Sequence, residues 1–113
     1  MRRIVFAPSF DEEFFAISLS IQTRFGSRAA DEFEARVQRI AQTLADAPSI
    51  GTREHGYSTT LYAHVLTPNW IFYRFTDTEV QFLHIRDGRR AKDDQTFEQV
   101  REARQPGAGM TSV

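Results

Sequence analysis

The stretch WIFYRFTDTEVQFLHIRDGRRAK, residues 70–92, contains two apolar segments joined by a short turn. Residues 70–76 and 79–86 are rich in aromatic and β-branched side chains, and Asp77-Thr78 separates them, which predicts a β-hairpin. Apolar residues occur at both odd and even positions of the first segment, so both faces of that strand are apolar. We therefore expect it to be a central strand of a sheet.

The second strand of this hairpin is expected to alternate regularly between the two faces of the sheet. Leu83 and Ile85 then share one face, and the opposite face carries Val80, Phe82 and His84. A tight turn at Asp77-Thr78 also sets Arg74 roughly opposite Phe82 in the hairpin.

The rest of the chain adds two further strands. Residues 59–66, TTLYAHVL, are another aromatic and β-branched segment, and Thr67-Pro68-Asn69 separates them from the hairpin. The three segments together predict an antiparallel meander. Residues 3–7, RIVFA, predict a first strand that Pro8 ends, and the turn-rich residues 49–57 are interpreted as a loop.

Between the first strand and that loop, the spacing of apolar residues predicts two helices. Ser9 and Glu12 have the spacing of a capping box, and the acids of residues 11–13 are interpreted as first-turn residues that complement the helix dipole. Gly26 ends the first helix; Ser27 or Asp31 starts the second, and Pro48 stops it. The apolar stripe of the first helix is Phe10, Phe14, Ile17, Ile21 and Phe25, and that of the second is Phe33, Val37, Ile40 and Leu44.

The predicted order is β-α-α-β-β-β, an α+β fold with a helical hairpin packed on one face of a small, twisted, mainly antiparallel sheet. A chain of 113 residues predicts one domain, here residues 1–104. Residues 94–104 are expected to form a last short helix with Phe97 and Val100 as its apolar contacts. Residues 105–113 lack core-forming side chains and are expected to be disordered.

Composition excludes several kinds of chemistry. The chain has no cysteine, and its three histidines lack metal-ligand spacing, so we expect no metal site and no cofactor. It lacks a glycine-rich phosphate loop and a Gly-x-Ser-x-Gly elbow. No signal peptide and no membrane-spanning segment is apparent, which predicts a cytoplasmic protein without a membrane partner.

Basic residues gather where the last strand ends. Arg86, Arg89, Arg90 and Lys92 lie within seven positions, although the formal net charge of the chain is only −1. Arg74 lies on the neighbouring strand and Arg53 in the loop before the sheet. Guanidinium groups suit phosphate oxygens or acidic side chains. A solvated strand end whose charges prevent edge aggregation explains the cluster equally well.

The strand order and two motifs resemble the RelE/ParE superfamily of type II toxin–antitoxin toxins. The similarity covers residues 2–92 and rests on the opening RIVFAPSFDEEF and on the Tyr73-Arg74 pair before a turn, followed by a strand that closes in HIRDGRR. The resemblance implies a small toxin that a cognate antitoxin protein neutralises. It also implies that operator DNA is reached only indirectly, through the antitoxin.

Two activities occur in that superfamily. The ParE branch binds DNA gyrase, whereas the RelE branch cleaves mRNA on the ribosome. The resemblance transfers the basic positions to Arg74, Arg89 and Arg90, which would be the catalytic residues of a RelE-like enzyme, and to Arg53 before the sheet. Together with Arg86 and Lys92 these residues form the predicted target-binding set.

The residues after the last strand indicate the branch. No tyrosine or histidine occurs after residue 84, and Phe97 stands where a nuclease of this superfamily often has its tyrosine. Phenylalanine cannot transfer a proton, so acid–base assistance is lost there. The sequence therefore favours the gyrase-directed branch. The alternatives are a RelE-type endoribonuclease and a domain that has lost toxicity and only binds an antitoxin-like partner.

Overall fold

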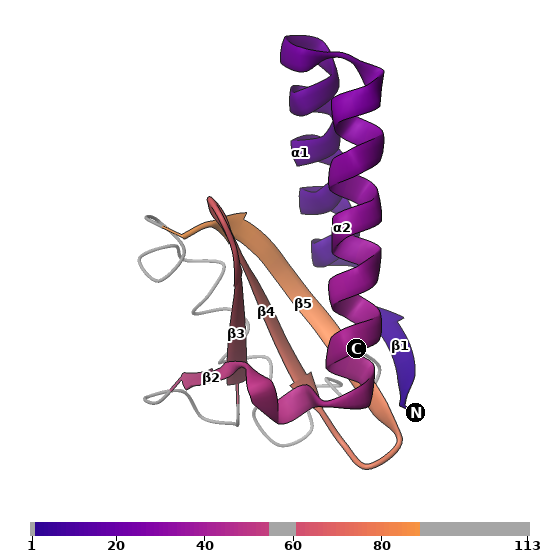
Figure 1. Cartoon of the computed structure of the whole chain (residues 1–113). Coiled ribbons are helices and arrows are strands. Elements are labelled where there is room, and N and C mark those ends of the chain that lie inside the picture. Colours follow the sequence, from indigo (N-terminus) through magenta and orange to yellow (C-terminus); the bar gives the residue numbers. More distant parts are fainter. Residues whose placement is uncertain (1, 55–60, 89–113) are drawn as a thin grey trace.

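The computed structural model describes residues 2–54 and 61–88, and its elements follow the predicted α+β order (Figure 1). The residues before, between and after those two ranges (1, 55–60 and 89–113) are not described, so the predictions for 94–104 and 105–113 lie outside the described residues. The elements are β1 (Arg3–Phe6), α1 (Pro8–Phe25), α2 (Ser27–Asp46), the short 3-10 helix η1 (Pro48–Ile50), β2 (Thr52–Glu54), β3 (Leu61–Leu66), β4 (Asn69–Phe75) and β5 (Glu79–Asp87).

The sheet has the strand order β1-β5-β4-β3-β2, in which β1 runs parallel to β5 and the other neighbours are antiparallel. The prediction that β4 is central is confirmed. The prediction of a continuous loop over residues 49–57 is wrong, because Thr52–Glu54 pairs with β3. A strand of three residues is too short to show an alternating pattern, so its pairing depends on the neighbouring strand.

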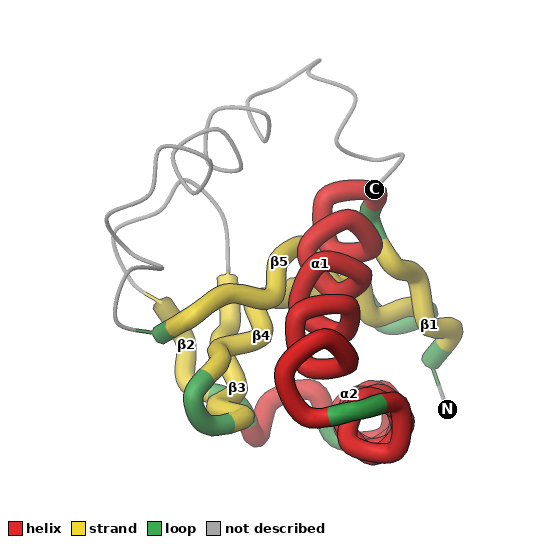
Figure 2. Tube along the Cα trace, turned by 90° about the horizontal axis from the view of Figure 1, so that it is seen from above, coloured by secondary structure: helices red, strands yellow, loops and turns green. Residues whose placement is uncertain are grey.

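Both helices lie on one face of the sheet, and the end of their hairpin projects beyond it (Figures 1 and 2). No helix among the described residues is long and apolar enough to cross a membrane. The predicted capping box is wrong: α1 begins at Pro8, and its N-cap is Ala7, without a side-chain cap. Proline suits the first helical position because it has no N–H to satisfy and its φ is already helical.

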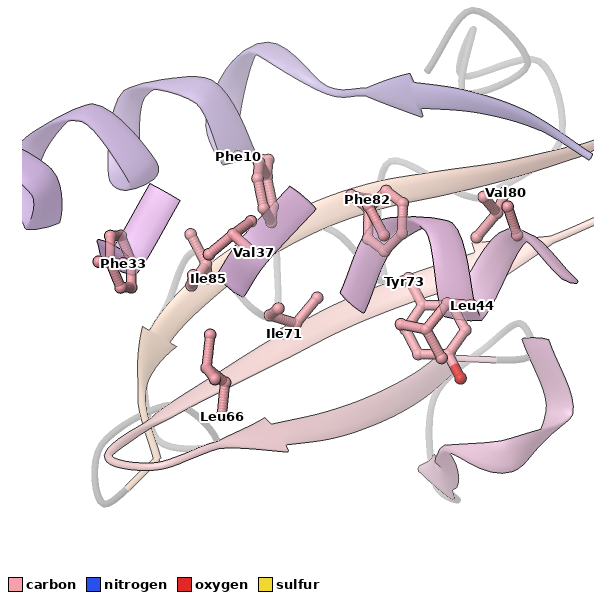
Figure 3. Packing of buried hydrophobic residues seen from close by; sticks show 12 residues of the cluster. Phe10, Phe33, Val37, Leu44, Leu66, Ile71, Tyr73, Val80, Phe82 and Ile85 are labelled. Carbon is pink, nitrogen blue, oxygen red and sulfur yellow. The ribbon is translucent and has the colours of Figure 1, made fainter. Parts of the chain in front are cut away.

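The main core lies between the helices and the sheet (Figure 3). Phe10 of α1 packs against Phe6 and Phe82, with ring centroids 5.2 and 5.9 Å away. The predicted stripes supply most of the helical side of this core. Phe25 is an exception, because it is the last residue of α1, at the projecting end of the hairpin, and is 70 % exposed.

A β-bulge interrupts the regular alternation predicted for β5. Phe72 pairs with His84 but Tyr73 pairs with Phe82, so Leu83 is an extra residue in β5. Ile85 therefore joins Phe82 in the helix-side core, and its predicted place beside Leu83 is wrong. Leu83 belongs to a second cluster, which contains Ala7, Leu61, Ala63 and Phe72, with Trp70 packed against it.

Candidate functional site at the end of strand β5

Glu13 of α1 binds the last residues of β5 through four donors. Its Oε1 accepts a hydrogen bond from the Ile85 amide at 3.1 Å and lies 3.0 Å from Nδ1 of His84. Its Oε2 accepts from Nε of Arg86 at 2.6 Å and also forms an ion pair with the Nη2 group. Glu13 therefore has a structural role, as predicted, but this role lies in its contacts with β5 as well as in the first turn of the helix, because the carboxylate connects α1 to the strand that precedes the basic segment.

This contact arises because β1 is shorter than β5. The last backbone bond of β1 to β5 runs from the Ala7 amide to the Phe82 carbonyl, at 2.9 Å. Beyond it, Ser9 Oγ donates to the Leu83 carbonyl at 2.7 Å, and Glu13 accepts from Ile85. Ser9 and Glu13 are one helical turn apart, so one face of α1 replaces the missing strand along the edge of β5.

His84 is 1 % exposed, and its Nδ1 faces Glu13. Its other ring nitrogen, Nε2, has no hydrogen-bond partner among the described residues. Those residues contain no group of three or more histidine, cysteine or carboxylate side chains that could hold a metal ion. His64 on β3 is half-buried, and burial lowers its pKa below the ordinary 6.5. His55 lies outside the described residues.

Arg74 is buried on β4, 8 % exposed, and its Nε donates to the side-chain oxygen of Gln81. The two residues are cross-strand partners, so the predicted position of Arg74 opposite Phe82 is one residue off. Gln81 in turn donates to Glu79, and Arg3 pairs with the same carboxylate at 2.5 Å. These hydrogen bonds from Gln81 and Arg3 hold the pKa of Glu79 below its ordinary value.

Tyr73, the partner of Arg74 in the predicted motif, is fully buried on the helix side of the sheet (Figure 3). Its hydroxyl donates to the Pro48 carbonyl at 2.5 Å and accepts from the Gly51 amide at 3.2 Å. Burial raises the pKa of Tyr73 to about 12, although the Gly51 N–H opposes that shift. This phenol is therefore a buried structural group whose hydroxyl is bonded inside the fold.

Arg53, the basic residue before the predicted sheet, lies far from Arg86 in the fold. Arg53 is exposed on β2, at the opposite edge of the sheet from β1. Three inter-strand steps separate β2 from β5, a lateral distance of about 14 Å. Arg53 also pairs with Tyr62, which belongs to the helix-side core, whereas Arg86 pairs with Trp70 of the second cluster. Arg89, Arg90 and Lys92 lie outside the described residues.

An open hollow of about 500 Å³ lies where β5 ends, lined by Val65, Thr67, Pro68, Trp70 and Gly88. The Gly88 amide donates to the Pro68 carbonyl at 3.0 Å, so the chain is fixed at this point. A side chain at residue 88 would overlap the Trp70 indole, so the close approach requires glycine. Sequence reasoning missed this hollow, although a glycine next to the arginines was a signal for it.

Comparison with known proteins identifies the family. The family model for the ParE toxin of the type II toxin–antitoxin system parDE matches residues 4–92. A solved structure titled "Chromosomal ParDE TA system from P. aeruginosa" shares the fold, with a TM-score of 0.65 and 16% sequence identity over 77% of this chain and 96% of that chain. None of the curated protein sequences matches the chain. Because the family model spans most of its length, the chain belongs to the ParE toxin family of type II toxin–antitoxin systems.

Proposed function

We propose that this protein is a cytoplasmic toxin that binds and inhibits DNA gyrase, and that a cognate antitoxin protein neutralises it. Membership of the ParE toxin family supports the toxin and the antitoxin parts of this proposal. The antitoxin would also carry the contact with operator DNA.

One observation carries the choice of gyrase over mRNA: the polar groups of the Tyr-Arg motif are used inside the fold. RNA cleavage needs a group that transfers a proton and a cation that reaches the phosphate. Tyr73 is buried with its hydroxyl bonded to the Pro48 carbonyl, and Arg74 is bonded to Gln81. His84 is buried beside Glu13, and no tyrosine or histidine follows it in the sequence. These contacts favour a toxin that acts by binding a protein.

The binding surface would be the basic segment of Arg89, Arg90 and Lys92, next to the Trp70 hollow. Gly88 fixes the start of this segment at the rim of the hollow. Tryptophan and arginine are the side chains that contribute most to binding energy at protein interfaces, and an apolar hollow beside cations suits a partner with an apolar side chain next to carboxylates. Arg86 would support this surface through Glu13, and Arg74 through Gln81. Arg53 would contact a separate part of the target.

The test is gyrase-catalysed supercoiling with purified protein. The double variant Arg89→Ala/Arg90→Ala should lose inhibition at least tenfold, whereas Arg36→Ala/Arg39→Ala on the exposed side of α2 removes the same charge and should inhibit like the wild type. Premixing with the product of the neighbouring short reading frame should abolish inhibition if that product is the antitoxin. Ribosome-dependent mRNA cleavage without any effect on supercoiling would overturn the proposal in favour of a ribonuclease.

A further inference from the structure

The two edges of the sheet differ in length and charge. Strand β2 forms one edge and has only three residues, Thr52–Glu54, two of which are charged. Short length and charge are common means by which proteins prevent an edge strand from pairing with another chain. Strand β1 forms the opposite edge (Figure 2), and its last three residues, Ile4, Val5 and Phe6, are all apolar. The β1 edge therefore lacks the protection that β2 has.

The backbone of β1 leaves the polar groups of two residues open along this edge. The amides of Arg3 and Ala7 donate to carbonyls on the β5 side of the strand, both at 2.9 Å. Successive residues of a strand direct their backbone groups to opposite sides, so Ile4 and Phe6 direct their N–H and C=O groups away from β5. No strand among residues 2–54 and 61–88 lies on that side of β1. These groups are therefore available for pairing with another chain.

A hollow beside the same edge suits a neighbouring strand with an apolar side chain. It has a volume of about 80 Å³ and is lined by Phe6, Phe10, Asp11, Phe14, Val37 and Gln38. Most of this lining is apolar, and Phe6 is the member that belongs to β1. A strand that pairs with the open edge would set one residue directly opposite Phe6, with the two Cα atoms about 5.5 Å apart. The side chain of that residue would lie at the hollow.

We propose that the β1 strands of two copies of this chain pair antiparallel about a two-fold axis at Val5, which joins their sheets into one. Ile4 of each copy then lies opposite Phe6 of the other copy, and these are the two residues whose backbone groups point outward. Each of the two Ile4–Phe6 pairs exchanges both of its N–H···O bonds. The hydrogen-bonding pattern of the edge is thus its own complement, as an interface between identical chains related by a two-fold axis requires.

The side chains of β1 also match in this register. Ile4 and Phe6 both pack against the helix-side core, so Ile4 of the second copy lies beside Phe6 at the hollow. Val5 faces Val5 of the second copy across the axis, and apolar β-branched side chains are favourable cross-strand neighbours. Arg3 is the charged residue of β1, and it lies opposite Ala7 of the second copy. No like charges therefore meet along the two strands.

The dimer goes beyond the proposed function and does not depend on it. Strands of four residues form a contact at the small end of specific interfaces, so association is weak and depends on concentration. Because β5 runs parallel to β1, and the two β1 strands run antiparallel, the two β5 strands end on opposite sides of the joined sheet. The dimer therefore presents two copies of the Trp70 hollow, one on each side.

Sedimentation equilibrium of the full chain tests the dimer. Between about 10 and 500 µM protein, the wild type should change from the 13.0 kDa monomer to a species of twice that mass. Val5 is half-buried and belongs to neither apolar cluster, so Val5→Lys should fold, but it sets like charges opposite each other and should weaken association about tenfold. The control Thr52→Lys adds the same charge to the β2 edge and should associate like the wild type. A wild type that stays monomeric at about 500 µM would overturn the proposal, as would equal weakening by both variants.

Amide hydrogen exchange of the wild type, followed by NMR, identifies the surface and remains valid if Val5→Lys fails to fold. The Ile4 and Phe6 amides should exchange about tenfold more slowly at high than at low protein concentration, whereas the Val5 amide, which is directed toward β5 in the monomer, should not change. An equal change at all three amides, or none at Ile4 and Phe6, would overturn the proposal. Protection of Ile4 and Phe6 only after the antitoxin is added would also overturn it, because the edge would then belong to that partner. Neither measurement involves gyrase, so the dimer and the proposed function can fail independently.

Discussion

Replacing Glu13 by alanine tests whether one carboxylate holds the end of β5. The change removes the acceptor of the Ile85 amide, of Arg86 and of the His84 ring. Glu12, the preceding residue, is exposed in the same helix and serves as the control. If the acids of residues 11–13 only complemented the helix dipole, Glu12→Ala and Glu13→Ala would cost the same, about 0.3–1 kcal/mol.

The contacts predict a much larger loss for Glu13. Removing one partner of a fully buried ion pair costs about 3–5 kcal/mol, and an unsatisfied amide about 1–3 kcal/mol. The Glu13 side chain is 22% and the Arg86 side chain 13% exposed, so water compensates part of both terms. We expect Glu13→Ala to lower the free energy of unfolding by about 2–4 kcal/mol. Glu12→Ala should change it by less than about 0.5 kcal/mol.

Urea denaturation followed by Trp70 fluorescence measures both variants. For a small domain, a loss of 3 kcal/mol moves the midpoint by about 1–3 M urea. Glu13→Gln keeps one acceptor oxygen and should fall between the wild type and Glu13→Ala. Equal midpoints for Glu12→Ala and Glu13→Ala would refute the reasoning, because the carboxylate would then contribute no more than a surface acid.

Three further predictions concern buried groups. Tyr73→Phe should lower the free energy of unfolding by about 1–2 kcal/mol, because the Pro48 carbonyl loses its donor. The folded-state pKa of Tyr73 is raised to about 12, so the contribution of its phenol to the free energy of unfolding is present below pH 10 and is lost as pH rises toward 12. Urea denaturation at a series of pH values should show this alkaline loss of stability in the wild type but not in the phenylalanine variant. The folded-state pKa of His64 is lowered, so its contribution to the free energy of unfolding is present above pH 6.5 and is lost as pH falls. In the His64→Phe variant, the free energy of unfolding should therefore depend less on pH between about pH 7 and 5. Gly88→Ala should lower the thermal midpoint, at a cost of about 1–3 kcal/mol, because its methyl group overlaps the Trp70 indole; an unchanged midpoint would contradict this packing.

Most of the fold could be predicted because its signals are local. Aromatic and β-branched segments separated by short turns identify β3, β4 and β5, and the i, i+3 and i, i+4 spacing of apolar residues identifies both helices. The errors occur where a neighbour decides the structure. The bulge at Leu83 moves Ile85 to the helix side of the sheet, and nothing within the strand sequence marks that extra residue. Strand β2 also cannot be recognised from its sequence, because its three residues take their conformation from pairing with β3.

The site was harder to predict because its contacts join distant parts of the chain. Glu13 lies 71 positions before His84, and Ser9 lies 74 before Leu83. Ser9 and Glu12 have the spacing of a capping box, so the sequence suggested that Ser9 caps the helix. In the structure Ser9 instead donates to the Leu83 carbonyl of β5. The Ser9–Glu13 spacing of one helical turn fits a helix that satisfies a strand edge, but that interpretation requires the knowledge that β1 stops at Phe6.

The contacts of Arg53, Arg74 and Arg86 bear on where the charge that we propose to bind the target lies. The charge of a cation that is paired with a carboxylate is largely compensated, and separating the pair to bind a target would cost the energy of that contact. Arg86 is bonded to Glu13 and Arg74 to Gln81, and Arg53 lies across the sheet from both. Of the basic residues at positions 86–92, Arg86 therefore belongs to the end of β5, and we propose that the cations after Gly88 carry the charge that binds the target. If gyrase binding depends on charge, substitutions after Gly88 should weaken binding while leaving stability unchanged, and substitutions at Arg74 and Arg86 should do the reverse.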